Sequence, residues 1–271
     1  MKIILKNNSL FKALRPFNDI GFVPTMGSIH EGHLSLIERS NRTCKKTIVS
    51  IFVNPKQFNN KKDFKNYPTN IKEDIKILKK TKKVDFLYIP KFKDIYNNNK
   101  KSNIKITKKD KILCAKYRKG HFEGVLDVME RLNNLVNPKK IFMGKKDYQQ
   151  YLLIKKYFKN KYKTTVIPCK TIRDENKIAL SSRNNHLNLN AIKKASFLSK
   201  SLIKLKKNLE NNKKKKKNLR TKMKYLEKFL KIRIEYLELR SIKNLKISNT
   251  ISGSRLFIAY YIENVRLIDN F

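Results

Sequence analysis

Two histidines, His30 and His33, are the side chains of this sequence best suited to chemistry. They lie in the stretch VPTMGSIHEGHLSLIERS, residues 23–40, where an apolar segment ends at a proline and a turn of small residues precedes a helical pattern. Imidazoles in such a turn can bind a metal, donate hydrogen bonds to a phosphate, or lie on the surface without a special role.

A metal site is the weakest of these interpretations. The zinc motif HExxH places both histidines on one helix face, whereas HEGH is one residue shorter and has a glycine at the helix entry. Zinc also needs further ligands, and no cysteine or other histidine lies nearby. Cys44, Cys114 and Cys169 are odd in number and far apart, which predicts thiols rather than a disulfide framework or a zinc cluster.

A phosphate site fits the same stretch better. The stretch joins a predicted strand to the N-terminus of a predicted helix, where backbone N–H groups and the helix dipole favour an anion. Gly27 and Gly32 allow the backbone to approach a ligand closely, and both imidazoles can donate hydrogen bonds. From local sequence alone, two surface histidines in a loop remain the alternative.

Short apolar segments alternate with helical patterns over the first two thirds of the chain. The predicted strands are 20–23, 47–53, 84–89, 140–143 and 164–172. The predicted helices between them include 33–43, 70–80 and 124–137. Because such alternation produces right-handed βαβ units, the sequence predicts an α/β fold with a parallel sheet.

The pattern changes after about residue 173. Amphipathic, lysine-rich segments at 188–210 and 219–239 predict helices, and the run NNKKKKKN between them predicts a solvated loop or helix end. The C-terminal stretch 254–270 has a β-like pattern. We therefore expect two domains, 1–172 and a smaller α+β domain at 173–271.

Polar residues follow three of the predicted strands. They are Asn54 and Gln57 after the second, Gly144, Lys146, Asp147 and Gln150 after the fourth, and Ser181, Ser182 and Arg183 after the fifth. Ligands of open parallel sheets bind beyond the carboxyl ends of the strands. The amides suit a small polar substrate, while the lysine, arginine and serines suit a triphosphate.

Taken together, these stretches resemble the pantoate–β-alanine ligase (pantothenate synthetase) family of the HIGH-motif nucleotidyltransferase superfamily. The matching stretches are VPTMGSIHEGH, SIFVNPKQF, Tyr67–Pro68, GHFEGV, GKKDYQQ, ALSSRN and RLIDN, in the family's order along nearly the whole chain. The resemblance implies a Rossmann-like N-terminal domain, a smaller C-terminal lid and a homodimer. It also implies that ATP and Mg²⁺ serve to join pantoate to β-alanine through a pantoyl adenylate.

The same resemblance implies roles for individual residues. The catalytic residues are His33, His30 and Lys146, with His33 as the proton donor. The ATP-binding residues are Met26, Gly27, Ser28, Ile29, His30, Glu31, Gly32, His33, Gly144, Lys145, Lys146, Asp147, Ile172, Leu180, Ser181, Ser182 and Arg183. Pantoate contacts Gln57, Gln150, Asn54 and Arg118, with Gln57 also near β-alanine. Mg²⁺ bridges the phosphates without a direct protein ligand, with Glu73 and Asp74 as an outer shell.

Four lysines depart from the family pattern without replacing a residue assigned to chemistry. Lys56, Lys119, Lys145 and Lys177 stand where the family has Met, Pro, Glu and Gly. At Lys119 a fixed φ is lost from a turn, and at Lys177 the backbone is strained if its φ is positive. Lys145 would lie beside the triphosphate and favour ATP binding.

The net charge of +44 admits two interpretations, a nucleic-acid partner or compositional drift. Lysines are spread over the whole chain rather than clustered, which favours drift because a binding footprint is local.

Two rival functions stay open from the residues alone: another nucleotidyltransferase acting on a phosphorylated acceptor, or an RNA-binding protein with an idle site. No apolar run approaches the ~20 residues of a membrane helix or the about 7–15 of a secretory signal, so we expect a cytoplasmic protein without a membrane partner.

Overall fold

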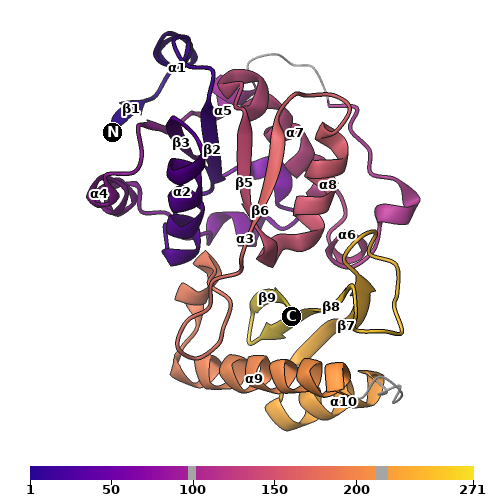
Figure 1. Ribbon diagram of the computed structural model, residues 1–271. Helices are drawn as coiled ribbons and strands as arrows, with labels where there is room; N and C mark the ends of the chain where they lie inside the picture. The colour runs from indigo at the N-terminus through magenta and orange to yellow at the C-terminus, as the bar shows by residue number, and fades with distance from the viewer. Residues whose placement is uncertain (97–101, 212–218) are drawn as a thin grey trace. The chain divides into compact units, whose positions relative to one another are not determined.

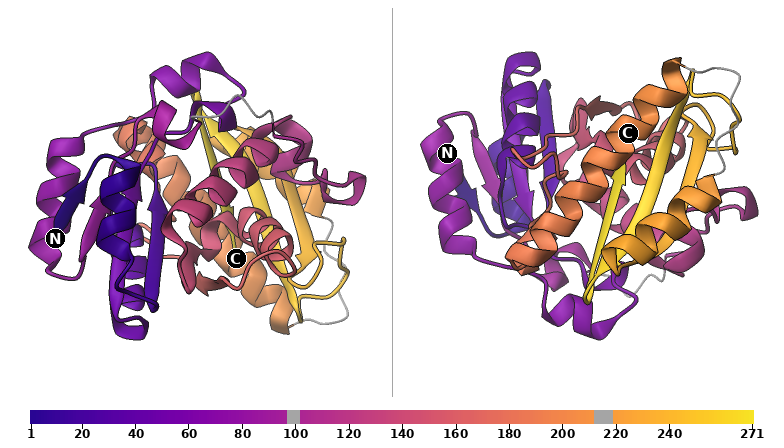
Figure 2. Two further views of the ribbon diagram at one scale, coloured as in Figure 1. Left: turned by 90° about the horizontal axis from the view of Figure 1, so that it is seen from above. Right: turned by 90° about the horizontal axis from the view of Figure 1, so that it is seen from below.

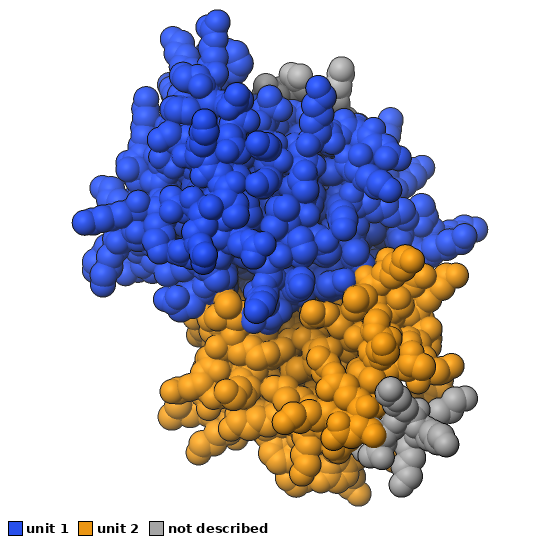
Figure 3. All heavy atoms as spheres, viewed as in Figure 1, with its two compact units in different colours: residues 1–171 blue, residues 172–271 orange. Residues whose placement is uncertain are grey.

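The chain divides into two compact units, residues 1–171 and 172–271 (Figure 3). The computed structural model describes residues 1–96, 102–211 and 219–271. The sequence-predicted boundary, between residues 172 and 173, lies one residue beyond the observed division. The predicted solvated loop NNKKKKKN falls, apart from its first residue, outside the described residues.

A six-stranded parallel sheet forms the centre of the first unit, in the order β1-β4-β3-β2-β5-β6 (Figure 1). Its strands are β1 (Lys2–Ile4), β2 (Ile20–Thr25), β3 (Lys46–Ile51), β4 (Phe86–Tyr88), β5 (Lys140–Gly144) and β6 (Thr165–Cys169). The chain moves outward from β2 through β3 to β4, and then resumes on the other side of β2 with β5 and β6. The topology therefore reverses between β2 and β5, and the carboxyl ends of these strands are where a ligand is expected.

Helices and short turns connect these strands. The helices are α1 (Asn7–Leu14), α2 (Glu31–Thr43), α3 (Lys61–Lys65), α4 (Ile71–Thr81), α5 (Phe92–Ile95), α6 (Cys114–Tyr117), α7 (His121–Val136) and α8 (Tyr148–Phe158). Turns of 3-10 helix cover Pro55–Gln57, Lys108–Asp110 and Lys145–Asp147. The predicted Rossmann-like α/β fold is confirmed, and α7 begins three residues earlier than the pattern 124–137 indicated.

Apolar side chains pack on both faces of the sheet. On one face, Val23, Val49 and Phe142 form a buried cluster with residues of α2 and α4. Phe22 and Ile48 alternate with these residues and so point to the opposite face. The mutually packed α7 and α8 form the layer there, and β5 and β6 run between α2 and α8 (Figure 1). Burial on both faces explains the almost continuous apolar runs of these strands.

The second unit is a three-stranded antiparallel sheet covered by two helices. The sheet has the order β7-β8-β9, and its strands are β7 (Arg233–Ser241), β8 (Ser254–Ile262) and β9 (Val265–Asn270). The helices α9 (Leu189–Asn211) and α10 (Leu219–Leu230) lie across one face (Figure 2) and share an apolar core with the strands. The predicted α+β class is confirmed. Within the described ranges, no helix combines the length and apolarity needed to cross a membrane.

One predicted helix is wrong in its second half. The segment 219–239 was expected to be helical throughout, but α10 ends at Leu230 and β7 begins at Arg233. Lys231, between them, has a φ of +51° and so ends the helix. Residues 232–239 contain no lysine, and from Ile234 the apolar residues follow a mostly two-residue period, which is typical of a strand.

The departure at Lys177 gives a first testable prediction. Its φ is +66°, in a turn closed by the bond from its N–H to the Asp174 carbonyl (3.0 Å). Because a Cβ destabilises this conformation by roughly 1–2 kcal/mol, Lys177→Gly is expected to raise the free energy of unfolding by about 1 kcal/mol. Urea denaturation measures the free energy of unfolding of each variant. Lys177→Ala, which removes the charge but keeps the Cβ, is the control, and equal stability of both variants would contradict the prediction.

Candidate active site

The loop after β2 turns the chain sharply into α2. Gly27 and Ser28 both adopt left-handed conformations, with φ of +81° and +52°. The Thr25 hydroxyl accepts a hydrogen bond from the Gly27 N–H (3.2 Å) and donates one to the Ser50 carbonyl of β3 (2.7 Å). A Cβ at position 27 would lie 2.9 Å from an Asp74 carboxylate oxygen, so glycine is required there by space as well as by φ.

The two histidines of this loop lie against each other. His30 is the N-cap of α2, and its Nδ1 accepts a hydrogen bond from the Gly32 N–H at 3.1 Å. Because Nδ1 is the acceptor, the neutral ring carries its proton on Nε2. The rings of His30 and His33 stack, with centroids 4.0 Å apart and planes at 25°. The HxGH spacing thus presents a pair of imidazoles at the N-terminus of a helix.

Both imidazoles are neutral at pH 7. Burial lowers the pKa of His30 to about 4, with a further contribution from the positive charge of Lys146. Burial, His30 and Lys146 lower the pKa of His33 well below its usual value. Among the described residues, His33 Nδ1 is buried without a hydrogen-bond partner. A buried polar atom of this kind is suited to a ligand, because leaving it unpaired costs free energy.

The lowered pKa of His30 predicts a loss of stability in acid. Its pKa of about 4 lies below the ordinary value of about 6.5, so the unfolded state binds the proton more tightly. Stability is therefore fully present above pH 6.5 and falls as the pH drops toward 4. Between pH 7.5 and 5.5 the wild type is expected to lose about 1.4 kcal/mol more than His30→Gln in urea denaturation.

The control for this comparison is His186→Gln, which removes an exposed histidine of the second unit. That variant is expected to lose as much stability in acid as the wild type. If His30→Gln loses as much stability in acid as the wild type, the folded state does not lower the pKa of His30.

The turn after β5 supplies a cation beside the imidazoles. Lys146 follows Gly144 in the turn Lys145–Asp147, and its ammonium lies 3.8 Å from the Asp147 carboxylate. Its charge lowers the pKa of both histidines. This proximity is expected because β5 is the neighbour of β2 across the switch point. Lys145 precedes it, and Gln150 lies in the first turn of α8, partly exposed.

The turn after β3 holds the two predicted amides. Asn54 caps the turn Pro55–Gln57, and its Oδ1 accepts from the Lys56 N–H (3.2 Å) and the Tyr96 hydroxyl (3.0 Å). Gln57 Nε2 contacts the Met26 sulfur at 2.7 Å, so this amide meets the loop after β2. A Cβ on Gly124 would lie 2.2 Å from the Lys56 carbonyl oxygen. Glycine at this position therefore lets α7 pack directly against the turn.

His121 is a site residue to which the sequence assigned no role. Its Nδ1 lies 2.7 Å from the Gln57 carbonyl oxygen, and its Nε2 lies 2.9 Å from the Arg118 guanidinium. A carbonyl only accepts and a guanidinium only donates, so Nδ1 carries the proton. His121 thereby joins Arg118, predicted to contact pantoate, to the turn that holds Gln57. The stretch GHFEGV was a motif of the resemblance, but this partner lies 64 residues away.

Lys56 occupies a defined place near these amides. Its ammonium lies 4.0 Å from the centroid of the Tyr96 ring and 4.0 Å from an Asp127 carboxylate oxygen. Arg131 lies over the same ring, 4.7 Å from its centroid. A lysine is stabilised there by a cation–π contact and a nearby carboxylate, although the family has methionine at this position.

The two carboxylates predicted as an outer shell for Mg²⁺ differ in their surroundings. Asp74 is buried, and both of its oxygens accept backbone N–H groups, from Ser28 (2.9 Å) and Ile29 (2.7 Å). Half of the Glu73 side chain is exposed, 4.0 Å from Lys76. Among the described residues, no three His, Cys, Asp or Glu side chains form a group able to hold a metal.

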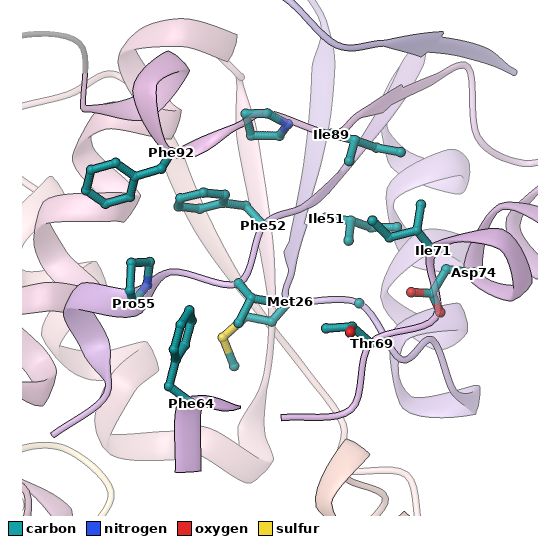
Figure 4. Close-up of a pocket in the computed structure, with 13 residues that line it drawn as sticks. Met26, Ile51, Phe52, Pro55, Phe64, Thr69, Ile71, Asp74, Ile89 and Phe92 are labelled. Atoms are coloured by element: carbon teal, nitrogen blue, oxygen red, sulfur yellow. The ribbon is translucent and has the colours of Figure 1, made fainter. Parts of the chain in front are cut away.

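A pocket of about 410 Å³ opens beside the loop, at the carboxyl ends of β2, β3 and β4. Its walls are mainly apolar, with Phe52, Pro55 and Phe64 among them, and Asp74 adds a carboxylate (Figure 4). Of the predicted site residues, it includes Met26, Gly27 and Asp74. The imidazoles and Lys146 are not among its lining residues.

The remaining predicted residues belong to the second unit. The Leu180 N–H donates to the Ile172 carbonyl (3.0 Å), which brings these two residues together. Ser181 caps the short 3-10 turn Ser182–His186 by accepting from the Arg183 N–H (3.4 Å). Ser182 is buried within this turn. The stretch ALSSRN therefore runs from an isolated bridge at Ala179 into a 3-10 turn.

A parallel sheet with an imidazole pair and a lysine at its switch point is the arrangement expected of an α/β enzyme that binds phosphate groups. Residues 2–271 match the family model for pantoate-beta-alanine ligase. The chain belongs to this family and is an ATP-dependent ligase. The resemblance predicted from the motifs is confirmed, whereas the rival nucleotidyltransferase and RNA-binding functions are not favoured.

Similar proteins cover nearly the whole chain. The pantothenate synthetase of Leptospira interrogans (serovar Lai) is 42% identical over 93% of this chain and 89% of its own. That of Pseudothermotoga lettingae is 37% identical over 99% and 98%. The crystal structure of pantothenate synthetase from Thermus thermophilus superposes with a TM-score of 0.91 at 31% identity, covering 100% and 99%. The ligase of Francisella tularensis, complexed with beta-gamma ATP and beta-alanine, gives 0.85 at 35% identity, covering 100% and 97%.

Proposed function

We propose that the protein condenses pantoate with β-alanine at the rim beyond β2, β3 and β5, through a pantoyl adenylate. The observation that carries this proposal is the stacked, neutral pair of His30 and His33 beside Lys146 at the switch point of the sheet. The ATP and β-alanine present in the Francisella relative support the choice of substrates.

The first step activates the pantoate carboxylate. A carboxylate oxygen attacks the α-phosphorus of ATP, a new P–O bond forms, the bond to the bridging oxygen breaks, and diphosphate leaves. The carboxylate is already ionised at pH 7, so no general base is needed. What the step demands is alignment of the reactants and stabilisation of charge on the phosphate oxygens.

The residues of the rim suit these demands. A neutral imidazole donates one N–H to a phosphate oxygen, and Lys146 supplies a positive charge. A phosphate close to His33 favours its protonated form, which is consistent with a proton donor. Gln57 and Asn54, with Gln150 and Arg118, would orient pantoate.

The second step transfers the acyl group. The amine nitrogen of β-alanine attacks the acyl carbon, a C–N bond forms, the C–O bond to the phosphate breaks, AMP leaves, and the nitrogen gives up one proton. Gln57 is assigned here to β-alanine as well as pantoate. Its backbone carbonyl is fixed by His121, so the turn that carries its side chain is held in place.

Three further features belong to the proposal. Mg²⁺ bound to the phosphates would neutralise part of their charge, with Glu73 able to approach a water of the ion. The first domain, 1–172, would bind the nucleotide and pantoate, and the second, 173–271, would act as a lid carrying Leu180, Ser181, Ser182 and Arg183. A homodimer in the cytoplasm completes the proposal.

The decisive experiment measures AMP release from ATP by the purified protein, with pantoate and β-alanine added singly and together. Release that requires both compounds would support the ligase. A folded protein that binds ATP but releases no AMP with any combination would contradict it. A phosphorylated acceptor that replaces pantoate would instead favour another nucleotidyltransferase.

A further inference from the structure

Asp74 is a buried carboxylate whose two hydrogen bonds join its helix to the histidine loop. It lies in the first turn of α4, and 2% of its surface is exposed. Its two oxygens accept from the N–H groups of Ser28 and Ile29, which lie 46 and 45 residues earlier in the chain. Burying a charged carboxylate is costly unless it is hydrogen-bonded, and here both bonds go to the histidine loop.

The contact supports a strained part of the loop. Ser28 is a non-glycine residue with a φ of +52°, a conformation that persists only when the surroundings enforce it. The carboxylate points from α4 toward the turn that follows Met26 (Figure 4). A Cβ on residue 27 would lie 2.9 Å from its Oδ2. Asp74 thus fixes the backbone of the two residues that immediately precede His30.

We propose that Asp74 is a positioning residue for the adenylation step, holding the Ser28–Ile29 backbone so that His30 and His33 face the phosphates. This inference rests on the proposed function. It replaces the outer-shell role predicted for Asp74, because both oxygens already accept backbone N–H groups and only 2% of the residue surface is exposed.

The two roles make different predictions for the Mg²⁺ requirement. A displaced loop lowers the rate of chemistry even at saturating Mg²⁺, because a misplacement of about 1 Å can cost about 10²-fold. A lost outer-shell ligand instead raises the Mg²⁺ concentration needed for half of the maximal rate. Diphosphate release in a single turnover, from ATP and pantoate without β-alanine, isolates the step concerned.

Asp74→Asn and Asp74→Ala form the test pair, and Asp85→Asn is the matched control. Asparagine keeps one acceptor oxygen, whereas alanine leaves both N–H groups unpaired. Asp85 also accepts a backbone N–H, from Thr47 at 2.8 Å, but it does so at the amino ends of β3 and β4, whereas the histidine loop follows the carboxyl end of β2. All rates are measured at a temperature where urea curves show each variant to be folded.

We expect the maximal rate of diphosphate release to fall about 10²-fold in Asp74→Ala and less in Asp74→Asn, with an unchanged half-saturating Mg²⁺ concentration. Asp85→Asn should keep the wild-type rate. A wild-type rate in folded Asp74→Ala, or a normal maximal rate reached only at raised Mg²⁺, would overturn the positioning role. A wild type that itself releases no diphosphate would overturn the proposed function, and the positioning role with it.

Discussion

Replacing His33 with alanine is expected to lower the rate of AMP formation by about 10³-fold, the upper end of the effect of removing one preorganised donor. The residue is half-buried, and its buried Nδ1 has no partner among the described residues. The free energy needed to remove water from this nitrogen is therefore spent during folding and not when a ligand binds. The loss should appear in kcat rather than in the KM for β-alanine, because the phosphate charge develops during the first step.

His186→Ala provides the control for His33→Ala, since it removes an exposed histidine from the second unit. The two variants should be compared by AMP release and by urea denaturation. An apolar replacement at position 33 removes an unpaired buried polar atom, so we expect no large loss of stability there. Near-normal AMP release by His33→Ala would contradict the assignment of His33 to the phosphates.

The fold was predictable wherever the hydrophobic period was unambiguous. The strands from β2 to β5 are largely buried on both faces, and their apolar runs are bounded by polar or turn residues. β1 was missed because it has three residues, of which only Ile4 is buried. The error at 219–239 arose because Ile234 and Leu237 have a spacing that also fits a helix, although they lie in a strand with a register shift between Ile234 and Tyr236. Both side chains are buried in the apolar core of the second unit.

The candidate site was predictable in its local motifs and not in its long-range contacts. The HEGH stretch, the amides after β3 and the lysine after β5 all lie beyond strand ends, where topology alone brings side chains together. The partners of Asp74 and His121 could not be inferred, because each contact joins residues more than 40 positions apart. An aspartate in the first turn of a helix is usually a helix-dipole residue, and nothing in the local sequence indicates that Asp74 accepts bonds from another loop.

Exchanging Lys146 for methionine is expected to change both catalysis and the titration of the histidines. The ammonium lowers the pKa of His30 and His33 in the protein without substrates. Methionine keeps much of the side-chain volume but removes the charge. The pKa of both imidazoles should therefore rise, while the rate of AMP formation should fall about 10²–10³-fold for loss of one cation at the phosphates. NMR titration of the imidazoles and AMP release measure the two effects.

The two effects of Lys146→Met act on the reaction rate in opposite directions. Their balance shows whether the reaction needs protonated histidines or the fixed charge of the lysine. If the histidines needed only to be protonated, raising their pKa would partly compensate for the lost lysine near pH 6. If the phosphates need the fixed charge itself, as we expect, the rate stays low at every pH although the imidazoles titrate higher. Lys146→Arg keeps the charge and so should leave the imidazole pKa values low. Because its planar guanidinium differs from a point charge, it should restore AMP release only in part, and full recovery would show that charge without geometry is sufficient.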